Sequence, residues 1–166
     1  MARLEPAEIR LRREEVVIGQ LIDEILAECS DQLCGHSVQV RIANEDLAVS
    51  ADRELLTVTI AELIANSAKY SGADSPIVIA TQEKDHRLLI SVHNEGSVID
   101  VEDRELIFER SYRSSATRYC ASGSGIGLSI AKKTAEAQQG HIWVTKAALA
   151  AISLITKHLR MLTNNL

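Results

Sequence analysis

Strand-like segments occur mostly as adjacent pairs between helical segments, and this order constrains the fold more than any other feature of the sequence. Helical periodicity predicts three helices, which cover residues 14–33, residues 55–70 behind a cap at Asp52, and residues 128–138 ahead of Gly140. Short apolar or alternating runs predict five strands, at residues 38–42, 76–81, 88–92, 141–144 and 151–156. The order predicts a two-layer α/β sandwich with a mixed, largely antiparallel sheet in one domain, residues 1–166.

The composition excludes several classes of protein. The chain has 166 residues, of which 46% are hydrophobic and 25% charged, as is typical of a globular domain with a sizeable core. Its net charge of −5 offers no positive field to nucleic acid or anionic lipid. No apolar run approaches the ~20 residues that span a bilayer, and no signal peptide is recognisable, so we expect no insertion into a membrane. The three cysteines form no metal-binding pattern, which favours a reduced, cytoplasmic location.

A set of polar residues lies on one face of the second predicted helix, in ELIANSAKYS (62–71). Glu62, Asn66 and Lys69 have the spacing i, i+4 and i+7, which places them on one side of a helix. An amide oxygen suits Mg²⁺, which takes few protein ligands, and an ammonium group suits phosphate. Taken alone, the same pattern also fits the solvated face of an ordinary amphipathic helix.

Two further segments carry glycines next to predicted elements. In SVHNEGSVI (91–99), Asn94 and Gly96 follow a strand, which is typical of a turn or of a backbone that approaches a flat ligand closely. In SGSGIGLSIAKK (122–133), three alternate glycines precede a helix, whose free N–H groups can bind an anion. No strand precedes these glycines and no GK[ST] follows them, so neither a dinucleotide-binding fold nor a P-loop is indicated; a flexible hinge is the alternative.

A fourth segment, IFERSYR (107–113), combines the only phenylalanine of the chain with two arginines. Phe108 by itself predicts a core position, and the arginines fit the exposed end of a helix. None of the four segments alone decides a function.

Together, the four segments resemble the conserved boxes of bacterial two-component sensor histidine kinases. ELIANSAKYS resembles the N-box, VHNEGSVI the first glycine box, IFERSYR the aromatic box and GSGIGLSIAKK the second glycine box, in the order and with the intervals of that family. The resemblance covers roughly residues 2–156. It implies the Bergerat ATP-binding fold, in which about three helices cover one face of the sheet, with ATP and Mg²⁺ as cofactors.

The resemblance also implies roles for single residues. Asn66 would coordinate Mg²⁺, and Asn94 would accept the adenine amino hydrogen where the family most often has Asp. Glu62 would act as a base or orient water, although a structural role is equally open. Lys69, Arg110 and Arg113 would bind the phosphates, and Lys69 would also belong to the catalytic residues. Tyr70 would pack near the adenine or ribose, and the base would lie against Gly96, Ile99 and Leu128. The lid over the nucleotide would contain Gly123, Gly125 and Gly127.

Two positions depart from the family pattern. An Asn in place of Asp at residue 94 loses a charge-assisted hydrogen bond, at a cost of about 1 kcal/mol. Val98 replaces the second glycine of the first glycine box, and a β-branched residue is strained wherever φ is positive. We therefore expect nucleotide binding that is retained but weakened.

None of the five histidines stands in the acidic, helical context of a phosphoacceptor. Residues 1–13 resemble the junction that follows the dimerisation hairpin of these kinases. The resemblance thus implies a monomeric catalytic domain that phosphorylates a histidine on a separate hairpin. The phosphoryl group would then pass to the receiver domain of a response regulator. The alternatives are a degenerate nucleotide-sensing module and an anti-sigma-factor-type serine kinase; IFERSYR and the long lid disfavour the second.

Overall fold

The fold is taken from a computed structural model of the chain. It describes residues 10–72, 74–85, 87–96, 99–114, 124–144, 151–153 and 159–161.

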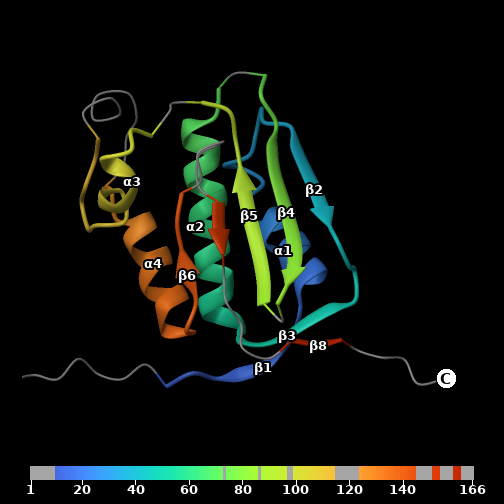
Figure 1. The fold of residues 1–166 in the computed structure, drawn as a ribbon. Helices are drawn as coiled ribbons and strands as arrows, with labels where there is room; N and C mark the ends of the chain where they lie inside the picture. The colour runs from blue at the N-terminus through green and yellow to red at the C-terminus, as the bar shows by residue number, and fades with distance from the viewer. Residues whose placement is uncertain are drawn as a thin grey trace, which may run out of the picture.

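A five-stranded sheet forms one layer of the molecule (Figure 1). In spatial order it contains β2 (Val38–Ile42), β4 (Ile77–Lys84), β5 (Arg87–His93), β7 (Ala151–Ser153) and β6 (His141–Ile142). The pair β2–β4 is parallel and the other three pairs are antiparallel, which confirms the mixed, largely antiparallel sheet. The predicted hairpin is β4–β5, with Ile79 opposite Val92.

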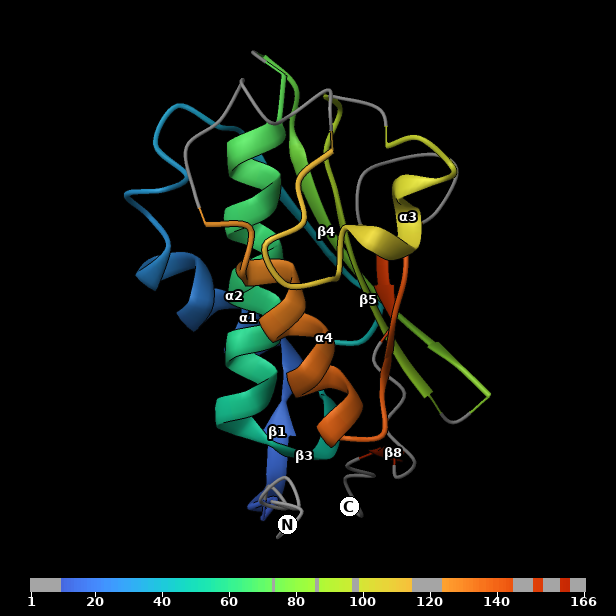
Figure 2. The same ribbon diagram turned by 90° about the vertical axis from the view of Figure 1, so that its left-hand side faces the viewer.

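Three helices form the second layer, all on one side of β4 and β5 (Figure 2). They are α1 (Ile18–Glu28), α2 (Arg53–Tyr70) and α4 (Gly127–Ala137), and a single turn, α3 (Asp103–Leu106), lies outside this layer. One apolar core joins the two layers, and its largest fully buried side chains are Ile18, Leu21, Ile22, Ile25, Leu47, Leu56, Ile60, Leu63, Ile64, Ile77, Ile79 and Leu88. The predicted sandwich is therefore confirmed.

A second, smaller sheet was not predicted. It contains β1 (Arg13–Val17), β3 (Leu47–Asp52) and β8 (Leu159–Met161), in the order β1–β3–β8 with antiparallel pairs. The prediction of a helix from residue 14 was wrong, because Val16 is fully buried opposite Val49 and the helix begins only at Ile18. The expected junction over residues 1–13 lies mostly outside the described residues, and Arg13 belongs to β1.

Two other predicted boundaries change. The strand expected over 141–144 is limited to His141–Ile142, and of the strand expected over 151–156 the structure describes Ala151–Ser153. Helix α4 ends near Gly140, as predicted, but the residue with a left-handed backbone is Gln139, at φ 62°.

Asp52 joins three segments at the beginning of α2. One carboxylate oxygen accepts from the Leu55 N–H at 3.1 Å, which confirms the predicted cap, and the other accepts from the Arg12 N–H at 2.8 Å. The Asp52 N–H donates to Oε1 of buried Gln138, at 2.7 Å. Since Gln138 immediately follows α4, these bonds fasten the end of α4 to the beginning of α2.

The cysteines differ in their surroundings. Cys29, next to α1, is buried, and Cys34 is exposed; Cys120 lies outside the described residues. Burial, followed by the nearby carboxylates of Glu28 and Glu62, raises the pKa of the Cys29 thiol. In the described part of the chain, no helix combines the length and the apolar content needed to cross a membrane.

Candidate functional site

Asn94, directly after β5, carries a buried amide that has no hydrogen-bond partner in the described part of the chain. The residue is 1% exposed, and neither Oδ1 nor Nδ2 has a hydrogen-bond partner among the described residues. Burial of an amide without hydrogen bonds costs about 1–3 kcal/mol, and such groups are rare unless a ligand or water completes them. Asn94 is therefore the clearest indication of a polar ligand in the described structure.

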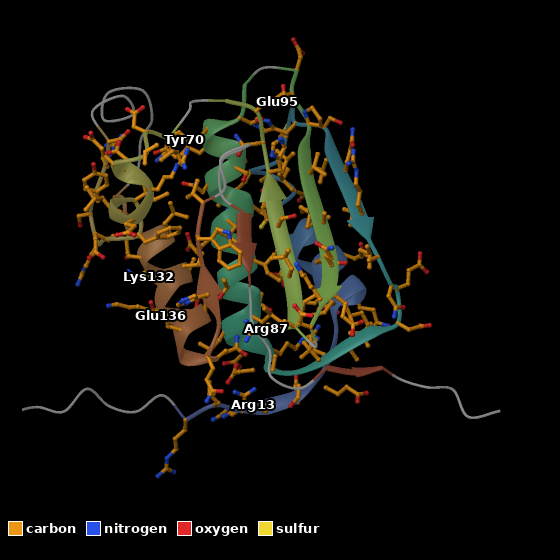
Figure 3. The ribbon with its side chains drawn as sticks, in the orientation of Figure 1. Arg13, Tyr70, Arg87, Glu95, Lys132 and Glu136 are labelled. Carbon is orange, nitrogen blue, oxygen red and sulfur yellow. The ribbon has the colours of Figure 1, made fainter. Side chains whose placement is uncertain are left out.

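The end of α2 and the segment after β5 are held against each other. Ser71 and Gly96 form a β-bridge, and the Gly72 N–H donates to the Glu95 carbonyl at 2.6 Å. A Cβ atom at residue 96 would collide with the Tyr70 carbonyl oxygen. Figure 3 shows Tyr70 and Glu95 at the same end of the molecule. Gly96 is therefore required by the contact between these two backbones, a reason that the sequence did not reveal.

The predicted polar face of α2 leads away from this junction. Glu62 and Asn66 are half-buried, while Lys69 is exposed with its Nζ 5.0 Å from the centre of the Tyr70 ring. With a rise of 1.5 Å per residue, the stretch from Glu62 to Tyr70 covers about 12 Å along the helix axis. Ser67, which the sequence reasoning missed, is fully buried and its hydroxyl has no partner among the described residues. The sequence feature that could have indicated burial of Ser67 is its position four residues after Leu63, on the same face of the helix.

The beginning of α4 meets the other end of this polar face. Gly127 is the first residue of α4, and a Cβ atom there would overlap the Glu62 carboxylate. Ile126, the residue at the cap position, forms no side-chain hydrogen bond to this helix end, and the first turn of α4 contains no acidic residue. The first N–H groups of a helix lack partners within the helix and carry partial positive charge, so they attract anions.

The segment with the two arginines lies against the chain just before α4. The Ser111 N–H donates to the Gly125 carbonyl at 3.0 Å. Gly125 has φ +69°, and a Cβ atom there would lie 2.9 Å from the Tyr112 carbonyl oxygen, so this position requires glycine. Arg110 is exposed and Arg113 is half-buried on either side of this contact. Lys132 in α4, labelled in Figure 3, adds an ion pair to Glu109 at 3.3 Å.

The structure thus brings the predicted residues together in three groups along α2 and α4. One end holds Tyr70, Asn94 and Gly96, and the other holds Glu62 and Gly127. Gly125 contacts the segment that carries Arg110 and Arg113. Ile99 and Leu128 are half-buried, and Leu128 packs against the core. Gly123 and Val98 lie outside the described residues.

The described residues contain no group of three or more His, Cys, Asp or Glu side chains that could hold a metal ion. The oxygen donors of the α2 face are Asn66 and, one turn earlier, Glu62. This donor set fits Mg²⁺, which keeps several waters and uses one or two protein ligands together with phosphates.

Comparisons with known proteins identify the family of the chain. The family model described as histidine kinase-, DNA gyrase B-, and HSP90-like ATPase matches residues 51–159. The sensor-like histidine kinase SenX3 of Mycobacterium tuberculosis is 31% identical over 146 residues, which cover 87% of this chain and 36% of SenX3. The sensor histidine kinase WalK of Bacillus subtilis is 30% identical over 147 residues, which cover 86% of this chain and 24% of WalK. The chain therefore spans about a third or less of these relatives.

Solved structures show the same fold. The catalytic domain of histidine kinase ThkA superposes with a TM-score of 0.76 at 26% identity, over 89% of this chain and 97% of that domain. ThkA in complex with the response regulator protein TrrA gives a TM-score of 0.72 at 25% identity, over 88% of this chain and 42% of that chain. Fold, ordered motifs and relatives agree, and the chain belongs to the histidine kinase-, DNA gyrase B- and HSP90-like ATPase family, as a catalytic domain of the sensor histidine kinase type.

Proposed function

We propose that the chain binds ATP with Mg²⁺ and transfers the γ-phosphoryl group to a histidine on a separate dimerisation hairpin of the same kinase. The observation that carries this proposal is the buried amide of Asn94, which has no hydrogen-bond partner among the described residues. An adenine ring whose amino group and ring nitrogen face this amide would satisfy both of its polar atoms.

The distance between the two ends of the site supports a nucleoside triphosphate. The base would lie beside Asn94 and Tyr70, and the phosphates beside the first turn of α4 at Gly127. These ends are separated by about 12 Å along α2, which suits a nucleotide bound along the helix rather than a small anion. The helix end compensates phosphate charge locally, which matters in a chain with a net charge of −5.

Mg²⁺, when bound, would neutralise charge on the phosphates during transfer. Asn66 would provide one oxygen ligand from the middle of α2. Glu62 stands one turn closer to α4 and would orient the reacting groups or hold the first turn of α4 in place. On the strength of the resemblance we assign Arg110, Arg113 and Lys69 to the phosphates; the segment that carries the two arginines contacts Gly125, just before α4. Catalysis would then consist mainly of positioning and charge neutralisation, as in other phosphoryl transfers.

The proposed partners lie outside this chain. The acceptor histidine would come from a dimerisation hairpin, and the phosphoryl group would pass on to a response regulator receiver domain. The likeness to ThkA, which has been solved with the response regulator protein TrrA, supports a response regulator as a partner. We place the domain in the cytoplasm, where ATP is available.

Binding and transfer can be tested separately. Titration calorimetry of the chain with ATP and Mg²⁺ is expected to show one site, and Asn66→Ala is expected to weaken binding in Mg²⁺ while changing metal-free binding little. Radiolabelled ATP is then mixed with the chain and a purified sensor-kinase dimerisation hairpin, and acid-labile, alkali-stable label is expected on the hairpin. No binding at millimolar ATP overturns the proposal; binding without transfer to any hairpin supports a nucleotide-sensing module instead.

A further inference from the structure

We propose that Asp103, in α3, is a positioning residue for phosphate binding. Its carboxylate holds Tyr112, and through Tyr112 it fixes the segment that carries Arg110 and Arg113. The proposal rests on the proposed function, in which these two arginines bind the phosphates of ATP. The observation behind it is a hydrogen bond of 2.6 Å that the Tyr112 hydroxyl donates to Oδ1 of Asp103.

The acceptor of this bond is itself held in place. The Asp103 N–H donates to the Asp100 carbonyl at 3.0 Å, and the Asp103 carbonyl accepts the Ile107 N–H at 2.9 Å. A hydroxyl that donates to a carboxylate over about 2.5–2.7 Å forms a charge-assisted bond, roughly twice as strong as a bond between neutral groups. Asp103 and Tyr112 are both half-buried, so water competes for this bond less than it does at an open surface.

The segment that carries the arginines is held from a second side by the chain before α4. Ser111 has φ 63°, a left-handed backbone that is uncommon for serine and persists where neighbouring contacts fix it. With this backbone, the Ser111 N–H donates to the Gly125 carbonyl at 3.0 Å. Tyr112 follows directly, and its side chain reaches Asp103. Two successive residues therefore join the segment to the chain before α4 and to α3.

A fixed Tyr112 restricts both arginines. Arg113 is the next residue of the chain, and Arg110 stands two residues before Tyr112. A segment that must become ordered on binding loses affinity to the cost of ordering, and a segment that is already ordered avoids that cost. Loss of the bond to Asp103 should therefore weaken binding of the phosphates and leave binding of the base unchanged.

The negative charge of Asp103 leads to an opposite expectation. A carboxylate near the phosphates repels them, so electrostatics alone predicts that its removal strengthens ATP binding. A positioning role predicts that removal weakens it. The two effects also differ for Asp103→Asn, because the amide loses the charge but keeps an oxygen that can accept the Tyr112 hydroxyl.

The test compares ATP with Mg²⁺ and adenosine, which has the base but no phosphate, in titrations of the chain. For Asp103→Ala we expect ATP to bind about fivefold more weakly, with adenosine binding unchanged. Tyr112→Phe should give the same loss, and the double variant should be no worse than either single variant, since all three lack the same bond. Asp103→Asn should keep most of the affinity for ATP.

Glu105→Ala is the matched control. It removes an exposed negative charge from the same turn of helix and should not weaken ATP binding. Thermal melts establish that each variant is folded.

Three results would overturn the proposal while the proposed function stands. If Asp103→Ala leaves ATP binding unchanged or strengthens it, the carboxylate does not position the arginines. If Tyr112→Phe alone weakens ATP binding, the hydroxyl acts without Asp103. An equal loss of ATP and adenosine binding would mean that Asp103 stabilises the domain as a whole. If the unchanged chain binds neither ATP nor adenosine, the proposed function fails and this proposal fails with it.

Discussion

Replacement of Gly96 by alanine is expected to strain the junction between α2 and β5. The added Cβ would overlap the Tyr70 carbonyl oxygen and come within 3.1 Å of the Tyr70 carbonyl carbon. This oxygen belongs to the backbone at the end of α2, which the hydrogen bond from Gly72 to Glu95 holds in place. The two segments must therefore move apart, because no side chain can rotate out of the way.

The magnitude follows from two opposing effects. Forcing an extra carbon into a packed site costs about 1–3 kcal/mol. Alanine also restricts the unfolded chain, which returns about 0.4–1 kcal/mol, and Gly96 has no positive φ that would penalise alanine. We expect the free energy of unfolding to fall by about 1–2 kcal/mol. Nucleotide binding should weaken as well, because Asn94 is two residues away.

Gly127→Ala provides a matched control in the other glycine-rich segment. There the added Cβ overlaps the carboxylate of Glu62, the free end of a flexible side chain. Rotation of that side chain costs about 0.5–1.5 kcal/mol, and alanine in a helix returns up to about 1 kcal/mol, so the free energy of unfolding should change by less than about 0.5 kcal/mol.

Urea unfolding followed by far-ultraviolet circular dichroism measures both changes. The reasoning is refuted if Gly96→Ala matches the unchanged chain within about 0.5 kcal/mol, or if Gly127→Ala is the more damaging variant.

Three further predictions concern residues outside the site. Gln138→Leu removes the acceptor of the buried Asp52 N–H and should lower the free energy of unfolding by about 1–3 kcal/mol in urea titrations; a loss below about 0.5 kcal/mol would contradict this. Lys132→Met breaks a partly exposed ion pair with Glu109 and should cost less than about 1 kcal/mol, as a double-mutant cycle can verify. Because burial raises the pKa of the Cys29 thiol, its contribution to stability is fully present below the pKa that this thiol has in the unfolded chain and is lost as the pH rises toward the folded value. Stability should thus decrease above that pH more steeply than in Cys29→Ala, and equal slopes would refute this prediction.

The sequence predicted the central elements of the fold because their signals are local. Helix α2 has a cap at Asp52 and buried residues at helical spacing, and the β4–β5 hairpin has two apolar runs around a charged turn. Strand β1 could not be recognised in this way, because helix α1 begins without a side-chain cap and the apolar pattern continues upstream through Val16 and Val17. That strand exists through its pairing with β3, more than thirty residues later.

The site was predictable in its residue types but not in its geometry. Asn94 and Gly96 stood out in the sequence, yet burial of the amide depends on how the end of α2 packs beside β5. The need for glycine at residue 96 comes from the Tyr70 carbonyl, which no local pattern indicates. Ser67 was missed because a serine in a helix is ordinarily assigned to the solvent side.

The pairing of β3 with β8 has a consequence during synthesis of the chain. Leu47 is paired with Met161, so another 114 residues must be translated after Leu47 before this edge of β3 can be covered. At about 5–20 residues per second, the ribosome needs roughly 6–23 s for that stretch. Throughout this interval β3, with buried Leu47 and Val49, has an open hydrogen-bonding edge. Unpaired strand edges bind other strands, so in the nascent chain this edge of β3 is open to pairing with other chains until β8 has been translated.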